Sequence, residues 1–264
     1  MGEIIAIANQ KGGVAKTTIT HNLSVALALQ KKRVLMLDLD SQASLTFCAG
    51  LKNPLDYDGK NIISILEKRP SIDIHECIYE VGADERLKNY LYIIPSIIDL
   101  AQMENEMYGR TSRERILAKA LSQIKDEFDY IIMDCPPQLG LMTINALSCA
   151  DSVIVPCKTD YLAFRGLQQL EETIAEIKEL VNPNLDVYGV VATLYQMRLK
   201  QDNEVKDMLY KNYHVITTIK QAAIAKKGVF DGISVIESAP EHEISVNIKQ
   251  IAEMLIDGTI RKEN

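Results

Sequence analysis

Short apolar runs alternate with amphipathic stretches along the chain. The runs are rich in Ile, Val and Leu and are mostly continuous, as is typical of strands in a parallel sheet that helices cover on both faces. We expect strands at residues 3–9, 33–40, 90–95, 130–134, 152–156, 187–194 and 214–220. This alternation predicts the α/β class, with a single doubly wound, mostly parallel twisted sheet between two layers of helices.

The stretches between the runs have helical periodicity. Residues 163–180 show it most clearly, because apolar side chains form one stripe and glutamates lie opposite. We also predict helices over residues 18–29 and 241–257. Residues 52–90 are the least regular part and are the expected place for insertions. Since no linker or repeat interrupts the pattern, we expect one domain over residues 1–264.

Charge and cysteine content narrow the class of protein. The net charge of −7 argues against a protein that coats nucleic acid with its whole surface. The five cysteines are scattered and form no Cys-x-x-Cys pair, so we expect neither a disulfide framework nor a zinc site. No leader or membrane-spanning run is visible, which predicts a cytoplasmic protein.

A glycine-containing loop lies between the first predicted strand and the first predicted helix. Such a loop binds phosphate through its backbone N–H groups and through the positive end of the helix. Lys16 is placed to reach the β- and γ-phosphates, and the Thr17 hydroxyl is placed to bind Mg²⁺. The nucleotide-binding candidates are Lys11, Gly12, Gly13, Val14, Ala15, Lys16, Thr17 and Thr18. The alternative is a tight turn with surface lysines.

Carboxylates follow two further predicted strands. Asp38 and Asp40 end the second one, and alternation places them on the same face. Asp134 ends the hydrophobic run at 130–134, as in a Walker B strand that holds Mg²⁺. Helix capping by Asp40 and Ser41 is the alternative interpretation of the first pair.

The phosphate loop and the two strands that end in carboxylates together resemble the three sequence motifs, or boxes, of a known family. The loop departs from the usual P-loop pattern, because Gln10 and Ala15 occupy the outer glycine positions. Instead, Lys-Gly-Gly-x-x-Lys-Thr resembles the deviant Walker A box of the ParA/MinD ATPases, and more closely that of the ParA/Soj partition proteins. Residues 38–42 and 134–140 are similar to the family's second and third boxes, with Ser41 in place of the usual proline.

The resemblance implies roles for individual residues. Lys11 would contact nucleotide held by the opposite subunit, and Asp40 would orient the attacking water. The implied catalytic set is therefore Lys11, Lys16 and Asp40, and the implied metal set is Thr17, Asp38 and Asp134. The implied cofactors are ATP and Mg²⁺.

Positive charge is concentrated in one late segment. Residues 195–228 carry a charge of +4, so the rest of the chain carries −11. Such a segment favours binding to DNA phosphates without sequence readout, although a solvated helix face is an alternative interpretation. The resemblance supports DNA binding here, with candidates at Arg198, Lys200, Lys220, Lys226 and Lys227.

The resemblance implies a DNA-segregation ATPase. We expect an ATP-dependent homodimer that binds nonspecific DNA, lies on the nucleoid, and hydrolyses ATP when a ParB-like centromere-binding partner stimulates it. Since the first strand begins near residue 3, we expect the small form without an N-terminal helix-turn-helix. Three alternatives remain. They are a relative that positions another cargo, a MinD-like division regulator that cycles on membranes, and an iron–sulfur carrier on the same scaffold.

Overall fold

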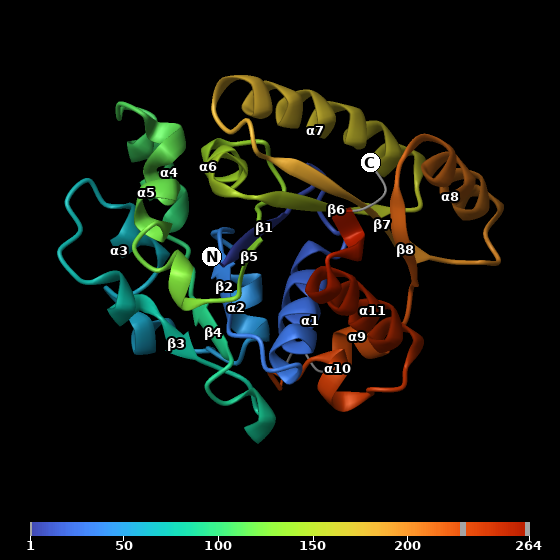
Figure 1. Cartoon of the computed structure of the whole chain (residues 1–264), viewed down its shortest axis with the longest axis horizontal. Helices are drawn as coiled ribbons and strands as arrows, with labels where there is room; N and C mark the ends of the chain where they lie inside the picture. Colours follow the sequence, from blue (N-terminus) through green and yellow to red (C-terminus); the bar gives the residue numbers. More distant parts are fainter. Residues whose placement is uncertain (1, 228–230, 262–264) are drawn as a thin grey trace.

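A mostly parallel sheet runs through the middle of the protein (Figure 1). The computed structural model describes residues 2–227 and 231–261. Within this part the sheet has eight strands in the order β3-β4-β2-β5-β1-β6-β7-β8. The strands are β1 (Glu3–Ile7), β2 (Val34–Asp38), β3 (Tyr79–Glu80), β4 (Leu91–Ile94), β5 (Tyr130–Asp134), β6 (Ser152–Lys158), β7 (Asp186–Tyr195) and β8 (Val215–Lys220).

The pairing confirms the predicted fold class. β1 lies between β5 and β6 and is parallel to both, and β2 is parallel to β5 and β4. The seven predicted strands are all present. The irregular region holds an additional one, the two-residue β3, which pairs antiparallel with β4 at the edge of the sheet. A strand this short leaves no hydrophobic pattern in the sequence, because only side-chain periodicity over several residues reveals a strand.

Helices cover both faces of the sheet. Within the described residues the α-helices are α1 (Lys16–Leu29), α2 (Ser44–Cys48), α3 (Ile62–Leu66), α4 (Leu100–Met107), α5 (Ile116–Leu121), α6 (Leu141–Cys149), α7 (Tyr161–Leu180), α8 (Lys200–Asn212), α9 (Ile224–Lys227), α10 (Val235–Ser238) and α11 (Glu243–Asp257). Figure 1 shows α1 and α11 on one side of the sheet and α6 and α7 on the other.

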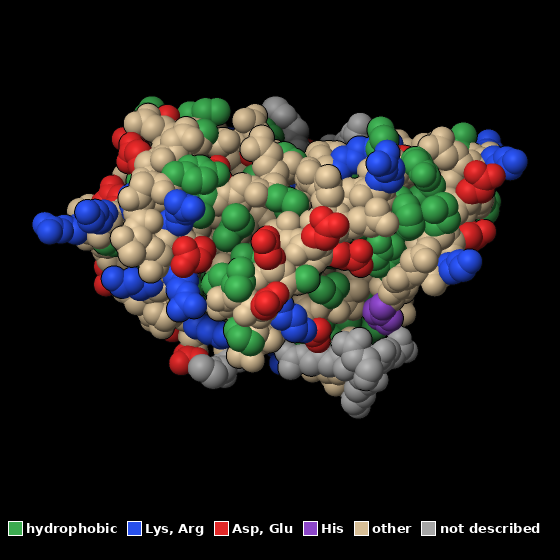
Figure 2. Space-filling model, turned by 90° about the horizontal axis from the view of Figure 1, so that it is seen from above, with side chains coloured by type: hydrophobic (Ala, Val, Ile, Leu, Met, Phe, Trp, Pro, Cys, Tyr) green, Lys and Arg blue, Asp and Glu red, His purple; other side chains and the backbone are tan. Residues whose placement is uncertain are grey.

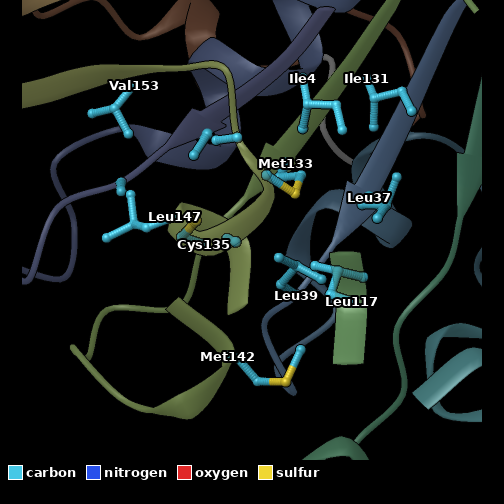
Figure 3. Packing of buried hydrophobic residues seen from close by; sticks show 14 of the residues in the cluster. Ile4, Leu37, Leu39, Leu117, Ile131, Met133, Cys135, Met142, Leu147 and Val153 are labelled. Carbon is cyan, nitrogen blue, oxygen red and sulfur yellow. The ribbon is translucent and has the colours of Figure 1, made fainter. Parts of the chain in front are cut away.

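Successive strand residues alternate between two hydrophobic clusters. In β1, Ile4 packs with α5 and α6, whereas Ile5 packs with α1 and α11. Figure 3 shows the first cluster at close range, with Ile4, Leu37 and Ile131 from three neighbouring strands beside residues of α5 and α6. Continuous apolar strands therefore arise because each of their two faces is buried.

The carboxyl ends of β1, β2, β5 and β6 meet at one edge of the sheet. Ligands bind at this edge in doubly wound folds, where neighbouring connections leave the sheet on opposite faces. The connection after β1 leads into α1 on one face, and that after β5 leads into α6 on the other.

All five cysteines are free thiols, and only Cys149 is partly exposed. Burial raises the pKa of the Cys135 thiol, so this residue is not a reactive thiolate. In the described ranges, no helix is both long enough and apolar enough to cross a bilayer.

Candidate nucleotide-binding site

The loop between β1 and α1 has a backbone conformation that few residues adopt. Gly13 has φ = 71° and Ala15 has φ = 69°, and both lie in the left-handed region. Asn9 fixes the start of the loop. Its Oδ1 accepts a hydrogen bond from the Lys11 N–H at 2.9 Å, and its Nδ2 donates to the Pro156 carbonyl at 2.6 Å. A left-handed alanine is strained, and such strain is concentrated at functional sites.

Helix α1 begins directly at this loop without a side-chain cap. Lys16, its first residue, is only 7% exposed, and burial lowers the pKa of its ammonium group. Its Nζ donates to the carbonyl oxygens of Asn9 at 3.1 Å and Lys11 at 3.2 Å, and to no carboxylate of the described chain. A buried cation and open helix N–H groups fit an anionic phosphate, which accepts hydrogen bonds from both.

Thr17 and Asp134 form the next part of the site. The Thr17 hydroxyl donates to Asp134 Oδ2 at 2.6 Å, and Thr20 Oγ1 lies 3.4 Å from Asp134 Oδ1. Burial, together with the nearby Asp38, raises the pKa of Asp134 to about 8. The Thr17 hydroxyl and the nearby Lys16 act in the opposite direction without overcoming burial, and a bound Mg²⁺ would stabilise the ionised carboxylate further.

Asp38 lies beside Asp134 in the register of β2 and β5, but it has a different set of partners. Its Oδ2 accepts hydrogen bonds from both the N–H and the hydroxyl of Thr46, each at 2.8 Å. The Thr46 hydroxyl in turn accepts from the Ser96 N–H at 2.9 Å. Asp38 therefore anchors the start of α2 and lies behind the site as a supporting carboxylate.

The relative placement of Asp38 and Asp40 differs from the one expected from strand alternation. The strand ends at Asp38, so alternation does not set the direction of Asp40, whose N–H donates to Asp38 Oδ1 at 3.1 Å. The capping interpretation is also wrong for Asp40 and Ser41. The N-cap of α2 is Ala43, in a left-handed conformation without a side-chain cap.

The proposed metal position is next to Asp134 and the Thr17 hydroxyl. Among the described residues, no group of three or more His, Cys, Asp or Glu side chains is arranged to hold a metal ion. Thr17 and Asp134 nevertheless fit Mg²⁺, because this ion keeps several waters and binds through few protein oxygens together with substrate phosphates.

The two raised carboxyl pKa values predict how stability depends on pH. Asp38 has a pKa of about 6 and Asp134 of about 8, both above their usual range because of burial. At these two groups the folded protein binds protons that the unfolded chain releases above about pH 4, so their contribution to the free energy of unfolding falls as pH rises towards 8. We expect Asp134→Asn to raise the unfolding temperature of the nucleotide-free protein at about pH 8 by roughly 2–4 °C.

Thermal unfolding at several pH values measures this effect. Glu172→Gln, which removes an exposed carboxylate of α7, is the matched control. A parallel pH profile for Asp134→Asn and the parent would show that Asp134 is ionised normally.

Lys11 is held within its own chain. Its Nζ donates to Asp160 Oδ1 at 2.7 Å, and the Nζ of Lys158 lies 3.1 Å from Asp160 Oδ2. Asp160 is also the N-cap of α7 and accepts from the Ala163 N–H at 2.8 Å. Although burial acts to raise the pKa of Asp160, the hydrogen bonds from these three groups keep it below its usual value.

The predicted DNA-binding residues lie at the far end of the sheet, and some are already paired. Arg198 is exposed in the loop before α8. Lys200 forms a salt bridge with Glu204 at 3.5 Å, and Lys220 forms one with Glu243 at 2.9 Å. Lys226 and Lys227 close α9, and their side chains lie outside the described part.

Three residues that form hydrogen bonds in the site were not identified from the sequence. They are Asn9, Thr20 and Asp160. Asp160 follows the end of β6, and the rule that ligands bind at the carboxyl ends of strands would have singled it out. Thr20 lies one turn after Lys16 on α1, on the face that meets β5. Asn9 carries no such signal, because its role depends on the contact with Pro156 across the sheet.

Comparisons with known proteins agree with this geometry. The family model described as an AAA domain matches residues 2–187. The sporulation initiation inhibitor protein Soj of Bacillus subtilis is 37% identical over 223 residues, which cover 81% of this chain and 81% of Soj. The chromosome partitioning protein ParA of Myxococcus xanthus is 38% identical over 205 residues, which cover 78% of this chain and 69% of ParA.

A solved structure shares almost the whole fold. Cobyrinic acid a,c-diamide synthase from Mycobacterium smegmatis, with a bound ATP analogue and magnesium, has a TM-score of 0.79 and 30% identity to this chain. The match covers 98% of this chain and 96% of that one. The chain belongs to the ParA/Soj family of P-loop partition ATPases, as the family model and the two partition relatives show together with the loop geometry.

Proposed function

We propose that this protein binds ATP with Mg²⁺ between two copies of itself and uses hydrolysis to control binding to DNA during segregation. The observation that carries the proposal is the convergence of Lys16, Thr17 and Asp134 at the start of an uncapped helix. Bound Mg²⁺ would neutralise phosphate charge at Thr17 and Asp134. The ATP analogue and magnesium in the M. smegmatis structure support this assignment.

The chain's own residues divide the work of hydrolysis. Lys16 and the N–H groups of residues 12–18 hold the phosphates, and Lys16 neutralises charge on them. Asp40 is half-buried, and its carboxylate accepts a hydrogen bond from the Gln42 N–H at 3.0 Å. It therefore has acceptor capacity left to orient an attacking water. Asp38 is engaged with Thr46 and keeps this loop in position.

Lys11 is the proposed contribution of one subunit to the other. Its ammonium group is about one-third exposed at the edge of the site and is held by Asp160. A lysine in this position can leave Asp160 and offset the charge that develops on phosphate in the opposite subunit.

We expect Asp160→Asn to favour dimer formation. The amide oxygen of asparagine still caps α7 at Ala163, but the charge that holds Lys11 is lost. Dimers should form at an ATP concentration about threefold to tenfold lower than for the parent, measured by light scattering. Asp186→Asn, at the start of β7, is the control. If half-maximal dimer formation needs the same ATP concentration in Asp160→Asn as in the parent, Asp160 does not restrain Lys11.

We also propose that the ATP-bound dimer binds DNA. The basic segment 195–228 supports it, and Arg198 is its exposed arginine without a salt bridge in the described chain. A ParB-like centromere-binding partner is the proposed stimulator, and the name of the chromosome partitioning relative ParA supports a role in segregation. Nucleoid association follows from the same proposal.

The test is a binding assay with a labelled DNA duplex of arbitrary sequence. It compares no nucleotide, ADP and ATP at two salt concentrations, with the parent and Arg198→Ala. We expect ATP-dependent, salt-sensitive binding that weakens in Arg198→Ala equally on all sequences. Binding that ignores the nucleotide, or strong sequence preference, would contradict the proposal.

The name of the M. smegmatis structure indicates a different, amide-forming enzyme on the same fold. We favour partition because Soj and ParA, at 37% and 38% identity, are more similar to this chain. Positioning of another cargo uses the same site, and only the identity of the partner protein distinguishes it from partition.

A further inference from the structure

A cavity outside the nucleotide site lies between the loop that follows α3 and the segment formed by α5 and the residues that connect α4 to it. Its volume is about 750 Å³, within the roughly 300–1,000 Å³ of ordinary ligand pockets. One wall is formed by residues 65–74, and the other by residues 109–123. Neither wall contains a residue of the proposed ATPase site.

The lining combines an aliphatic surface with basic side chains. The aliphatic part includes Ile65, Ile72, Ile74 and Ile116. The basic part consists of Lys68, Arg110, Arg115 and Lys119, against the two acids Glu67 and Asp73. Figure 2 shows Lys and Arg side chains gathered at this end of the molecule, whereas acidic side chains occupy the middle over α7.

Most of this positive charge is available to a ligand. Lys68, Arg115 and Lys119 are exposed and form no salt bridge with another residue of the described chain. Asp73, one of the two acids, is occupied by His75, whose Nδ1 lies 2.6 Å from its Oδ1. The cavity therefore attracts anions, and most strongly those that also bury aliphatic surface.

The side chains that line the cavity favour some classes of ligand over others. Among the described residues, no aromatic side chain lines the cavity, although stacking on aromatic rings is the usual way to hold a nucleobase. Branched aliphatic side chains instead suit Leu, Ile or Val of a peptide, and arginine forks suit its carboxylates. We propose that this cavity binds an acidic, aliphatic peptide segment of a partner protein.

Hydrogen bonds connect the cavity to the loop that follows Asp134. Arg110, at the cavity, donates to the Leu66 carbonyl and lies 3.4 Å from Met103 Sδ in α4. The next residue of α4, Glu104, accepts from the Met142 N–H at 3.1 Å, at the start of α6. Six residues separate the end of β5 at Asp134 from the start of helix α6.

The other wall is tied to the same helix. The fully buried Asn145 of α6 accepts from the Leu117 N–H of α5 at 3.1 Å and donates to the Arg113 carbonyl at 2.9 Å. Both α4 and α5 therefore bond to α6, and a peptide that moves them changes the position of α6. This coupling to hydrolysis rests on the proposed function, whereas peptide binding does not.

The binding test uses fluorescein-labelled peptides on the full chain without nucleotide. The first peptide alternates Glu and Leu, the second has Lys in place of Glu, and the third has Ser in place of Leu. We expect saturable, salt-sensitive binding of the first peptide only. The charge reversal Arg115→Glu/Lys119→Glu should lower its affinity at least about tenfold, and Arg115→Gln/Lys119→Gln should have an intermediate effect.

The control Lys88→Glu/Lys178→Glu makes the same charge change at exposed residues outside the cavity and should stay within about twofold of the parent. Equal loss in both double variants would mean that only net charge matters, and this would overturn the proposal. Equal binding of the Lys–Leu peptide, binding of free ATP at the cavity, or an unaffected Arg115→Glu/Lys119→Glu variant would overturn it as well.

A saturating amount of the Glu–Leu peptide should also change the ATPase rate of the parent more than about twofold. A bound peptide with no effect on a measurable rate would overturn the coupling. Absence of any ATPase activity, with peptide binding intact, would instead count against the proposed function.

Discussion

Replacing Lys16 with alanine is expected to lower the affinity for Mg-ATP at least about 100-fold. The ammonium group is buried, and within the described residues its hydrogen bonds go to the main-chain carbonyls of Asn9 and Lys11. A phosphate oxygen is a stronger, charged acceptor, and hydrogen bonds to charged groups contribute about 1.5–3 kcal/mol each. Losing one or two of them produces the expected change, which calorimetric titration measures directly.

Lys178→Ala is the matched control, because Lys178 is exposed near the end of α7. It should leave the affinity within about twofold of the parent, since a distant surface charge is screened by salt. An unchanged affinity in Lys16→Ala, with the fold intact by circular dichroism, would falsify the role given to this lysine.

The second large effect is expected for Asp40→Ala. Hydrolysis should fall about 100-fold to 10,000-fold, the usual range for the loss of a group that activates or positions water. Nucleotide affinity should change little, because the Asp40 carboxylate has a hydrogen bond only from Gln42 in the described chain and none to Lys16. Phosphate release and nucleotide titration measure the two quantities separately.

The same variant should accumulate as an ATP-bound dimer that stays on DNA. Asp58→Ala, an exposed acid in the loop before α3, is the control and should cycle like the parent. If Asp40→Ala hydrolyses ATP at the parental rate, another group must orient the water.

The sequence was sufficient to predict the central sheet and the phosphate loop. Ile4 and Ile5 pack on opposite faces of the sheet, so the continuous apolar run around them indicated a strand buried on both sides. The loop was predictable because glycines, a lysine and a hydroxyl residue occupy consecutive positions, and their chemistry depends on local geometry.

Contacts between distant segments were not predictable in the same way. Asp160 contacts Lys11 across 149 positions of the chain, and no local pattern records that pairing. The hydrogen bonds of both Asp38 oxygens to the loop and helix that follow it carried no signal in the sequence either. The direction of Asp40 was not predicted, because β2 ends at Asp38 and strand ends are the least reliable part of a prediction.

The net charge of a sequence segment likewise does not show which of its charged side chains are paired in the fold. The segment 195–228 is basic as a sequence, but Glu243 of α11 neutralises Lys220 from outside it. Arg198 lacks such a partner in the described chain and remains the stronger candidate for DNA contact.

The central claim is that nucleotide shared between two copies of the chain holds them together. Sedimentation velocity of Asp40→Ala with and without saturating Mg-ATP tests it most directly, because blocked hydrolysis preserves the complex. We expect a monomer without nucleotide and a dimer with Mg-ATP, and a return to monomer when Lys16→Ala is added. A single monomeric species at saturating Mg-ATP, with nucleotide binding confirmed, would contradict it.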